Sequence, residues 1–194
     1  MPKKPKNDSV TPAGPSTLVY QMKVTLKVVK PPIWRRLQVK SDITLKVFHK
    51  TIQIAMGWSD AHLHEFNIHG VSYGNPEDGV GSDEKKVRLN RLNLEEKDKF
   101  SYVYDFGDTW EHAILVEKIL PVDEKTQYPI CLKGKHSCPP EDCGGPWGYS
   151  ELLDALSDPY HPDYEESMEW VGGDFDYERF DIEKINWRLR AIRK

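Results

Sequence analysis

Apolar and polar residues alternate along the first half of the chain with a period of two, which is typical of half-buried β-strands. The alternation runs from Leu18 to Val28, stops at Pro31-Pro32 and resumes from Ile33 to Val39. Proline interrupts strand pairing because it has no backbone N–H donor. The pattern therefore predicts an antiparallel hairpin made of these two strands.

A helix is predicted directly after this hairpin. Thr44 is a suitable N-cap, and Gly57 can end the helix in a left-handed conformation. Between them, apolar residues recur every three or four positions at Leu45, Phe48, Ile52 and Ala55. An amphipathic helix of this kind is expected to pack on one face of the sheet.

Two further hairpins are predicted in the middle of the chain. One joins residues 62–68 to residues 71–73, and a loop rich in Gly, Asp and Pro follows it from Gly74 to Lys86. The other joins residues 100–106 to residues 110–116 through Gly107-Asp108. We expect Gly107 to have a positive φ, because tight hairpin turns require that conformation.

The last third of the chain has a helical pattern interrupted by Pro and Gly. Helices are predicted over Glu151–Leu156 and Tyr164–Val171, and from Asp181 onward. Strands that precede helices along the chain are typical of the α+β class. We predict a mainly antiparallel mixed sheet of five or six strands, with one helix after the first hairpin and a C-terminal helical segment.

Composition sets the domain organisation and the expected compartment. Residues 1–16 are rich in Lys, Pro and Ser and almost free of apolar residues, which predicts a disordered tail before a single domain over residues 17–194. No run approaches the roughly 18 apolar residues of a membrane span, and no apolar stretch follows the first lysines. We therefore expect a cytoplasmic protein without a membrane partner.

The net charge argues against nucleic acid as the main partner. The formal charge is −4 at pH 7, whereas phosphate binding requires a concentrated field of Lys and Arg.

One polar cluster is a candidate site. It comprises His62, His64, Asp108 and His112, which come from hairpins that can be neighbours in one sheet. His62 and His64 are two positions apart and would share a face of a strand. Imidazoles and a carboxylate suit a divalent transition metal. The alternative is structural, with the aspartate binding backbone N–H groups in the turn and the histidines bonded to sheet neighbours.

The cysteine-containing segment is a second candidate metal site. Cys131, His136, Cys138 and Cys143 provide four potential ligands of the two types, thiolate and imidazole, that bind zinc, but the segment has no pair of cysteines separated by two residues. The alternative is a proline-pinned loop in which the thiols behave as small apolar side chains.

Aromatic and basic residues could form a binding surface. The residues concerned are Trp34, Arg35, Arg36, Trp58 and Trp110. The alternation places Arg35 and Arg36 on opposite faces, so one of them is expected to meet a carboxylate, such as that of Asp174 or Asp176. Trp58 and Trp110 suit the core better than a substrate platform, because such rings dominate small cores.

Four segments carry a family resemblance. They are Pro32-Ile33-Trp34-Arg35-Arg36, residues 58–66 (WSDAHLHEF), residues 105–112 (DFGDTWEH) and residues 138–146 (CPPEDCGGP). In these segments the chain resembles the plasmid pRiA4b ORF-3-like family, and the resemblance extends from Tyr20 to about Arg190. It implies a shared fold and no defined activity. Some members carry a resolvase-like or transposon-associated label, but the chain shows no serine-recombinase constellation.

Three functions remain open from the sequence. The first is a non-catalytic binding or adaptor module that presents an aromatic-rich surface to a protein or a small ligand, because no complete nucleophile, phosphate-loop or dinucleotide signature is found. The alternative is a metal-dependent hydrolase or nuclease that uses the His/Asp cluster with zinc or another divalent metal. The second alternative is a plasmid- or transposon-associated DNA-binding protein. No cofactor is certain, and whether the chain is an enzyme stays open.

Overall fold

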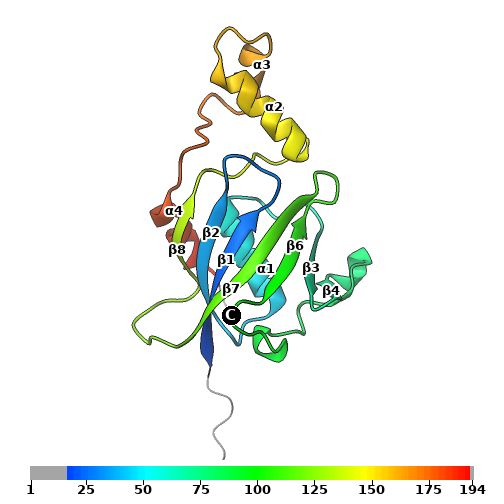
Figure 1. Ribbon diagram of the computed structural model, residues 1–194, viewed down its shortest axis with the longest axis vertical. Coiled ribbons are helices and arrows are strands. Elements are labelled where there is room, and N and C mark those ends of the chain that lie inside the picture. Colours follow the sequence, from blue (N-terminus) through cyan, green and yellow to red (C-terminus); the bar gives the residue numbers. More distant parts are fainter. Residues whose placement is uncertain (1–16, 193–194) are drawn as a thin grey trace, which may run out of the picture.

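Eight strands form one mixed sheet, which confirms the α+β class (Figure 1). The computed structural model describes residues 17–192, so the predicted tail of residues 1–16 lies outside that range. The strands are β1 (Leu18–Leu26), β2 (Trp34–Lys40), β3 (His64–Ile68), β4 (Val71–Gly74), β5 (Ser82–Asp83), β6 (Lys99–Tyr104), β7 (Trp110–Pro121) and β8 (Ile130–Lys135).

The strand order is β5-β4-β3-β6-β7-β1-β2-β8, and every neighbouring pair is antiparallel except β4 and β5. The predicted pairing of β1 with β2 is confirmed, with Met22 opposite Leu37. The expected count of five or six strands was too low. It missed β5, which has only two residues, and β8, whose Lys-Gly-Lys end breaks the apolar alternation.

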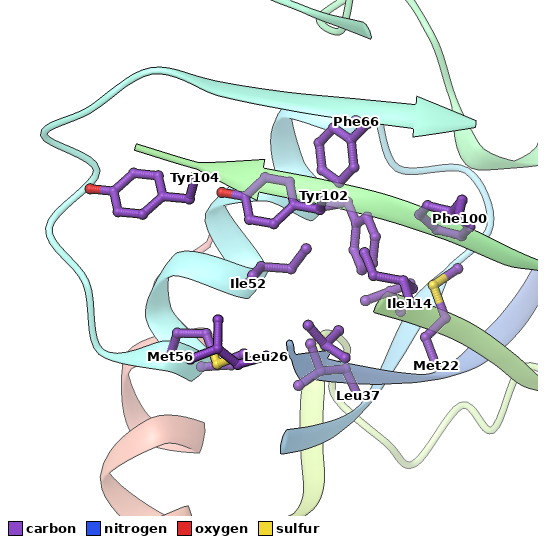
Figure 2. Packing of buried hydrophobic residues seen from close by; sticks show 14 of the residues in the cluster. Met22, Leu26, Leu37, Ile52, Met56, Phe66, Phe100, Tyr102, Tyr104 and Ile114 are labelled. Atoms are coloured by element: carbon purple, nitrogen blue, oxygen red, sulfur yellow. The ribbon is translucent and has the colours of Figure 1, made fainter. Parts of the chain in front are cut away.

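Helix α1 (Leu45–Met56) follows the first hairpin, as the sequence predicts. The Thr44 side chain accepts a hydrogen bond from the backbone N–H of Val47, and Gly57 ends the helix with φ of 99°. Ile52 and Met56 of α1 and Leu37 and Tyr102 of the sheet belong to the same buried core (Figure 2). The core therefore lies between α1 and one face of the sheet.

Three further helices follow the sheet: α2 (Gly145–Ser157), α3 (Tyr164–Trp170) and α4 (Ile182–Leu189). Helix α4 contacts both β8 and α1, whereas α2 and α3 pack on each other and project beyond one end of the sheet (Figure 1). Two short 3₁₀ helices lie in the connections, Pro76–Asp78 between β4 and β5 and Leu89–Arg91 between β5 and β6. Within residues 17–192, no helix is both long and apolar enough to cross a bilayer.

The loop between β6 and β7 differs from the predicted tight turn. Gly107 does not have a positive φ; the residues that do are Asp105 (58°) and Thr109 (56°). The Asp105 carboxylate accepts hydrogen bonds from the backbone N–H groups of Gly107 and Asp108, at 2.9 and 3.3 Å. The aspartate side chain thus organises a five-residue loop, and Gly107 needs no special conformation.

Candidate functional site

A polar stripe on α1 faces the sheet beside the apolar core. Lys46, His49 and Gln53 follow one another at spacings of three and four residues, which places them on one side of a helix. His49 and Gln53 are buried. A buried polar stripe requires partners, because an unpaired polar group in the interior is costly.

A chain of hydrogen bonds fixes the orientation of the His49 ring. The Gln53 amide donates to the Tyr102 hydroxyl oxygen at 3.0 Å, and that oxygen lies 2.9 Å from His49 Nδ1. On the other side of the ring, His49 Nε2 lies 2.6 Å from Asp60 Oδ1. The ring therefore directs Nε2 towards a carboxylate while the tyrosine holds Nδ1.

A second histidine–carboxylate pair lies next to the first. His64, the first residue of β3, places Nε2 2.8 Å from Glu84 Oε2, and Glu84 has no exposed surface. The other Glu84 oxygen lies 3.4 Å from Lys46 Nζ, which is also 3.9 Å from Asp60 Oδ2. One ammonium thus serves two carboxylates. We name His49, Asp60, His64 and Glu84 the His/carboxylate centre.

The pKa values favour a neutral His49 and ionised Asp60 and Glu84. Burial lowers the pKa of His49 to about 4. For Asp60 and Glu84, burial acts to raise the pKa, but hydrogen bonds from the histidines and nearby positive charges outweigh it, so both pKa values are lowered. Neutral imidazole and ionised carboxylate are the states that bind a metal ion.

The geometry is compact enough for a single ion. One ligand atom from each of His49, Asp60 and His64 lies within 4.8 Å of the others. Two ligands of one metal at bond lengths of about 2.0–2.2 Å lie roughly 3 Å apart. Small side-chain movements would therefore bring these atoms onto a shared ion.

The His/carboxylate centre borders a groove of about 510 Å³ between α1 and the end of α4. Asp60 belongs to the centre and also lines the groove, and its side chain is 35% exposed. Lys50, Ile54, Trp58 and Arg188 contribute to the groove walls. A small molecule in the groove would reach the centre through Asp60.

A second group of possible ligands lies on the loops beside β6. His62 Nε2 lies 3.2 Å from Asp142 Oδ1 and 3.7 Å from Asp105 Oδ2. The Asp142 side chain is 73% exposed. Exposed carboxylates gain little from a nearby partner, so this group is weaker evidence of a site than the buried centre.

The four residues of the polar cluster suggested by the sequence do not converge, and no three of them bring ligand atoms within 4.8 Å of one another. His64 lies in the His/carboxylate centre and His62 near Asp142. His112 is fully buried, with Nδ1 3.3 Å from the Tyr102 carbonyl oxygen. Asp108 has a buried oxygen without a hydrogen-bond partner within the described part of the chain.

The cysteine-containing segment does not form a four-ligand site either. Cys131, His136, Cys138 and Cys143 include no three residues with ligand atoms within 4.8 Å of one another. Cys138 Sγ lies near Arg35 and Met56, and the His136 ring stacks on Tyr177. Burial raises the pKa of Cys131 to about 11 and that of Cys143 to about 12, so both are protonated thiols.

The five aromatic and basic residues do not form one exposed surface. Trp58 and Trp110 are 4% and 1% exposed, so they are core residues. Arg35 is also buried and donates to four backbone carbonyls and to Cys138, rather than to Asp174 or Asp176. Arg36 is the arginine with a carboxylate partner, Glu117, at 2.6 Å, and the Trp34 ring lies beneath it.

Sequence reasoning missed His49, Asp60 and Glu84. The sequence contained one signal for them, because His49 occupies a position in the buried stripe of α1, next to Phe48. A polar residue in such a stripe predicts a buried partner. The partners themselves lie in separate loops and are brought to His49 only by the fold.

Comparison with known proteins identifies the family. Residues 18–184 match the family model described as plasmid pRiA4b ORF-3-like protein. The chain belongs to this family. It is 39% identical to the uncharacterized protein y4hQ of Sinorhizobium fredii over 190 residues, which cover 91% of the chain and 97% of that protein. The crystal structure of MM3350, a protein of unknown function from Methanosarcina mazei Go1, matches with a TM-score of 0.81 and 42% identity. The match covers 87% of this chain and 98% of the MM3350 chain.

Proposed function

We propose that this pRiA4b ORF-3-like chain is a metal-dependent hydrolase whose metal ligands are His49, Asp60 and His64, with Glu84 as the carboxylate partner of His64. The observation that carries the proposal is the convergence of two imidazoles and the Asp60 carboxylate within 4.8 Å, beside the fully buried Glu84 carboxylate that binds His64. Buried ionisable groups with shifted pKa values concentrate at functional sites.

The ligand chemistry supports zinc or another first-row transition ion. Nitrogen and carboxylate oxygen ligands suit zinc, iron, manganese and nickel. The two ionised carboxylates contribute two negative charges, which balance a divalent ion. Tyr102 holds the remote nitrogen of His49, the arrangement that fixes the orientation of metal-ligating histidines.

The position of the centre supports hydrolysis. A bound ion would act as a Lewis acid and lower the pKa of a coordinated water. The partly exposed Asp60 connects the buried ligands to the α1–α4 groove, so a substrate has a route to the centre. Lys46 remains beside both carboxylates and limits their mutual repulsion when no ion is bound.

Metal analysis tests the ligand assignment. Protein purified without chelator is analysed for zinc, manganese, iron and nickel, and the metal-free protein is titrated with each ion. We expect one ion per chain in the wild type and in the controls His161→Gln and His62→Gln, and loss of that ion in Asp60→Asn and His64→Gln. Equal metal content in all five proteins, or none in the wild type after loading, would overturn the assignment.

Activity is measured separately on chromogenic esters. The metal-loaded wild type is compared with Asp60→Asn and with the chelator-treated protein, using p-nitrophenyl acetate and p-nitrophenyl phosphate. We expect turnover only in the loaded wild type. A stoichiometric metal without turnover of either ester would refute the hydrolase and leave a metal-binding protein.

A second candidate function is a binding module, supported by the charge of the α2–α3 region. Residues 136–178 contain no Lys or Arg and twelve acidic residues. A groove of about 360 Å³ between α2 and α3 is lined by Asp142, Glu151, Asp163 and Glu166, with Leu152 and Trp170 as apolar neighbours. This chemistry fits a Lys/Arg-rich polypeptide segment of another protein.

Fluorescence anisotropy with a labelled lysine-rich peptide tests this candidate. Binding should weaken as salt rises and should fall in Glu166→Lys but persist in Glu77→Lys, which changes an exposed glutamate outside this region. If the two variants bind the peptide equally, the groove is not the docking site.

A further inference from the structure

We infer that the α1–α4 groove binds a phosphate group and that the substrate is a small phosphate monoester. The inference rests on the proposed hydrolase function and specifies its substrate class. It comes from the charges that line the groove and from the position of these charges relative to the His/carboxylate centre.

Two cations in the groove have no partner within the described residues. Lys50 of α1 and Arg188 of α4 both line the groove, and neither side chain has an ion pair or a hydrogen bond to the rest of residues 17–192. Asp60 is the one acidic residue in the lining, and it is already paired with His49 and Lys46. The free charge of the groove is therefore positive.

The cations are arranged from the centre outward. Lys46 and Lys50 are four residues apart on α1, so they lie on the same side of the helix. Lys46 contacts both carboxylates of the centre, and Lys50 extends the positive charge into the groove. Arg188 approaches from the opposite wall, and a guanidinium can bind a phosphate through two parallel hydrogen bonds.

The remaining walls suit the organic part of an ester. Ile54, Ala191 and Ile192 give the groove apolar surface, and Trp58 borders it. Its volume of about 510 Å³ falls in the range typical of small-molecule sites. The carboxylate-rich groove of α2 and α3 would repel an anion, so a phosphoanion would bind in the α1–α4 groove instead.

The reaction balances without a further reactant. A water oxygen forms a bond to phosphorus, and the bond between phosphorus and the ester oxygen breaks. A proton from the water passes to the leaving oxygen, which departs as an alcohol, and inorganic phosphate is the other product. Lys50 and Arg188 would hold the non-bridging oxygens of the phosphoryl group during this exchange.

Phosphate binding to the metal-free protein isolates this inference from the metal proposal. Inorganic phosphate is titrated into chelator-treated protein at low salt and followed by calorimetry. Losing one charge-assisted hydrogen-bond partner should weaken binding about tenfold in Lys50→Gln and in Arg188→Gln. The matched controls Lys133→Gln and Arg190→Gln, which change exposed cations outside the groove, should bind phosphate as the wild type does.

Kinetics with two esters complete the test. In metal-loaded protein, Lys50→Gln and Arg188→Gln should lower kcat/KM for p-nitrophenyl phosphate much more than kcat/KM for p-nitrophenyl acetate, without changing metal content. Wild-type protein that holds its metal and cleaves the acetate but does not bind phosphate would overturn this inference and leave the hydrolase standing. Phosphate binding that depends on Lys50 and Arg188 in a protein that takes up no metal would support the anion site and overturn the proposed function.

Discussion

The imidazole ring of His49 lies face to face with that of His64, with ring centroids 3.4 Å apart and ring planes inclined by 10°. Two imidazolium cations at this separation would repel each other strongly, because the burial of both rings weakens solvent screening. The lowered pKa of His49, about 4, keeps that ring neutral near pH 7. Packing thus holds at least one of the two rings in the state that can bind a metal.

The stacked rings predict a specific response to metal. Each Nε2 now faces its own carboxylate, so binding one ion requires the two nitrogens to converge. Zinc titration followed by NMR of the histidine ring protons should shift the His49 and His64 signals together and saturate at one equivalent. The His161 signals serve as the internal control. Shifts confined to His62 would instead place the ion in the exposed group with Asp142.

Removal of the buried Glu84 carboxylate should destabilise the fold. Glu84→Ala deprives His64 and Lys46 of their shared partner and leaves uncompensated polar groups, which we expect to cost about 3 kcal/mol. Glu84→Gln should cost less, because its amide oxygen can still accept a hydrogen bond from His64. Urea unfolding measures both, with Glu77→Ala, at an exposed site, as the control. Equal stability of Glu84→Ala and Glu77→Ala would contradict the role of this carboxylate.

His112 makes stability depend on pH. Burial lowers its pKa to about 4 from an ordinary value of 6.5. Between these values the unfolded chain binds a proton that the folded chain does not, so stability falls as pH drops from about 6.5 to about 4. The contribution of this one residue is about 3 kcal/mol.

The variant His112→Leu removes this titration, so the stability of the variant should fall less over the same pH range. Unfolding free energies measured at several pH values provide the comparison. Parallel curves for the two proteins would show that His112 does not titrate with this pKa.

Gly145 should be far less tolerant of a side chain than Gly107. Gly145 has φ of 68°, and a Cβ there would lie 2.5 Å from the Asp108 carbonyl oxygen, whereas a Cβ at Gly107 would meet a carboxylate oxygen of Asp105 at 3.2 Å. We expect Gly145→Ala to cost about 2 kcal/mol or more and Gly107→Ala less than about 1 kcal/mol. Thermal melts of the pair measure this difference, and the reverse order would refute the loop geometry.

Arg35→Lys should destabilise the protein although it keeps the charge. Arg35 uses all five N–H donors, and its partners lie on β2, at the end of α1 and around the end of β8. Lysine has three donors and no fork, so several buried carbonyls would lose their partners, at a cost of about 3 kcal/mol. Urea unfolding tests this prediction, with Arg91→Lys, at an exposed position, as the control. Equal midpoints for the two variants would contradict the prediction.

Local signals predicted the elements whose ends are set by nearby residues. The bounds of α1 follow from Thr44 and Gly57, and the β1–β2 hairpin follows from alternation around two prolines. The central pairing of β1 with β7 joins Val24 to Ile114, a contact that no local pattern encodes. β8 was missed because Gly134 breaks its pattern, and the reason for this glycine is tertiary: a Cβ there would collide with the Phe180 ring.

The candidate site was less accessible to sequence reasoning than the fold. The rule that residues two apart share a strand face failed for His62 and His64, because β3 begins at His64 and leaves His62 in the preceding loop. The partners that His64 does have, His49 and Glu84, come from a helix and from the segment after β5. Their meeting depends on how α1 packs on the sheet, which requires tertiary structure.

The unequal distribution of charge makes the protein an electric dipole. Residues 136–178 carry −12, whereas the other described residues, 17–135 and 179–192, together carry +4. The negative part includes the helices α2 and α3, which project beyond one end of the sheet (Figure 1). The residues that line the α1–α4 groove belong to the part with excess positive charge. The field would repel an approaching anion from the α2–α3 region and attract it to the α1–α4 groove before any contact forms. The rate of such encounters would fall as added salt screens the field.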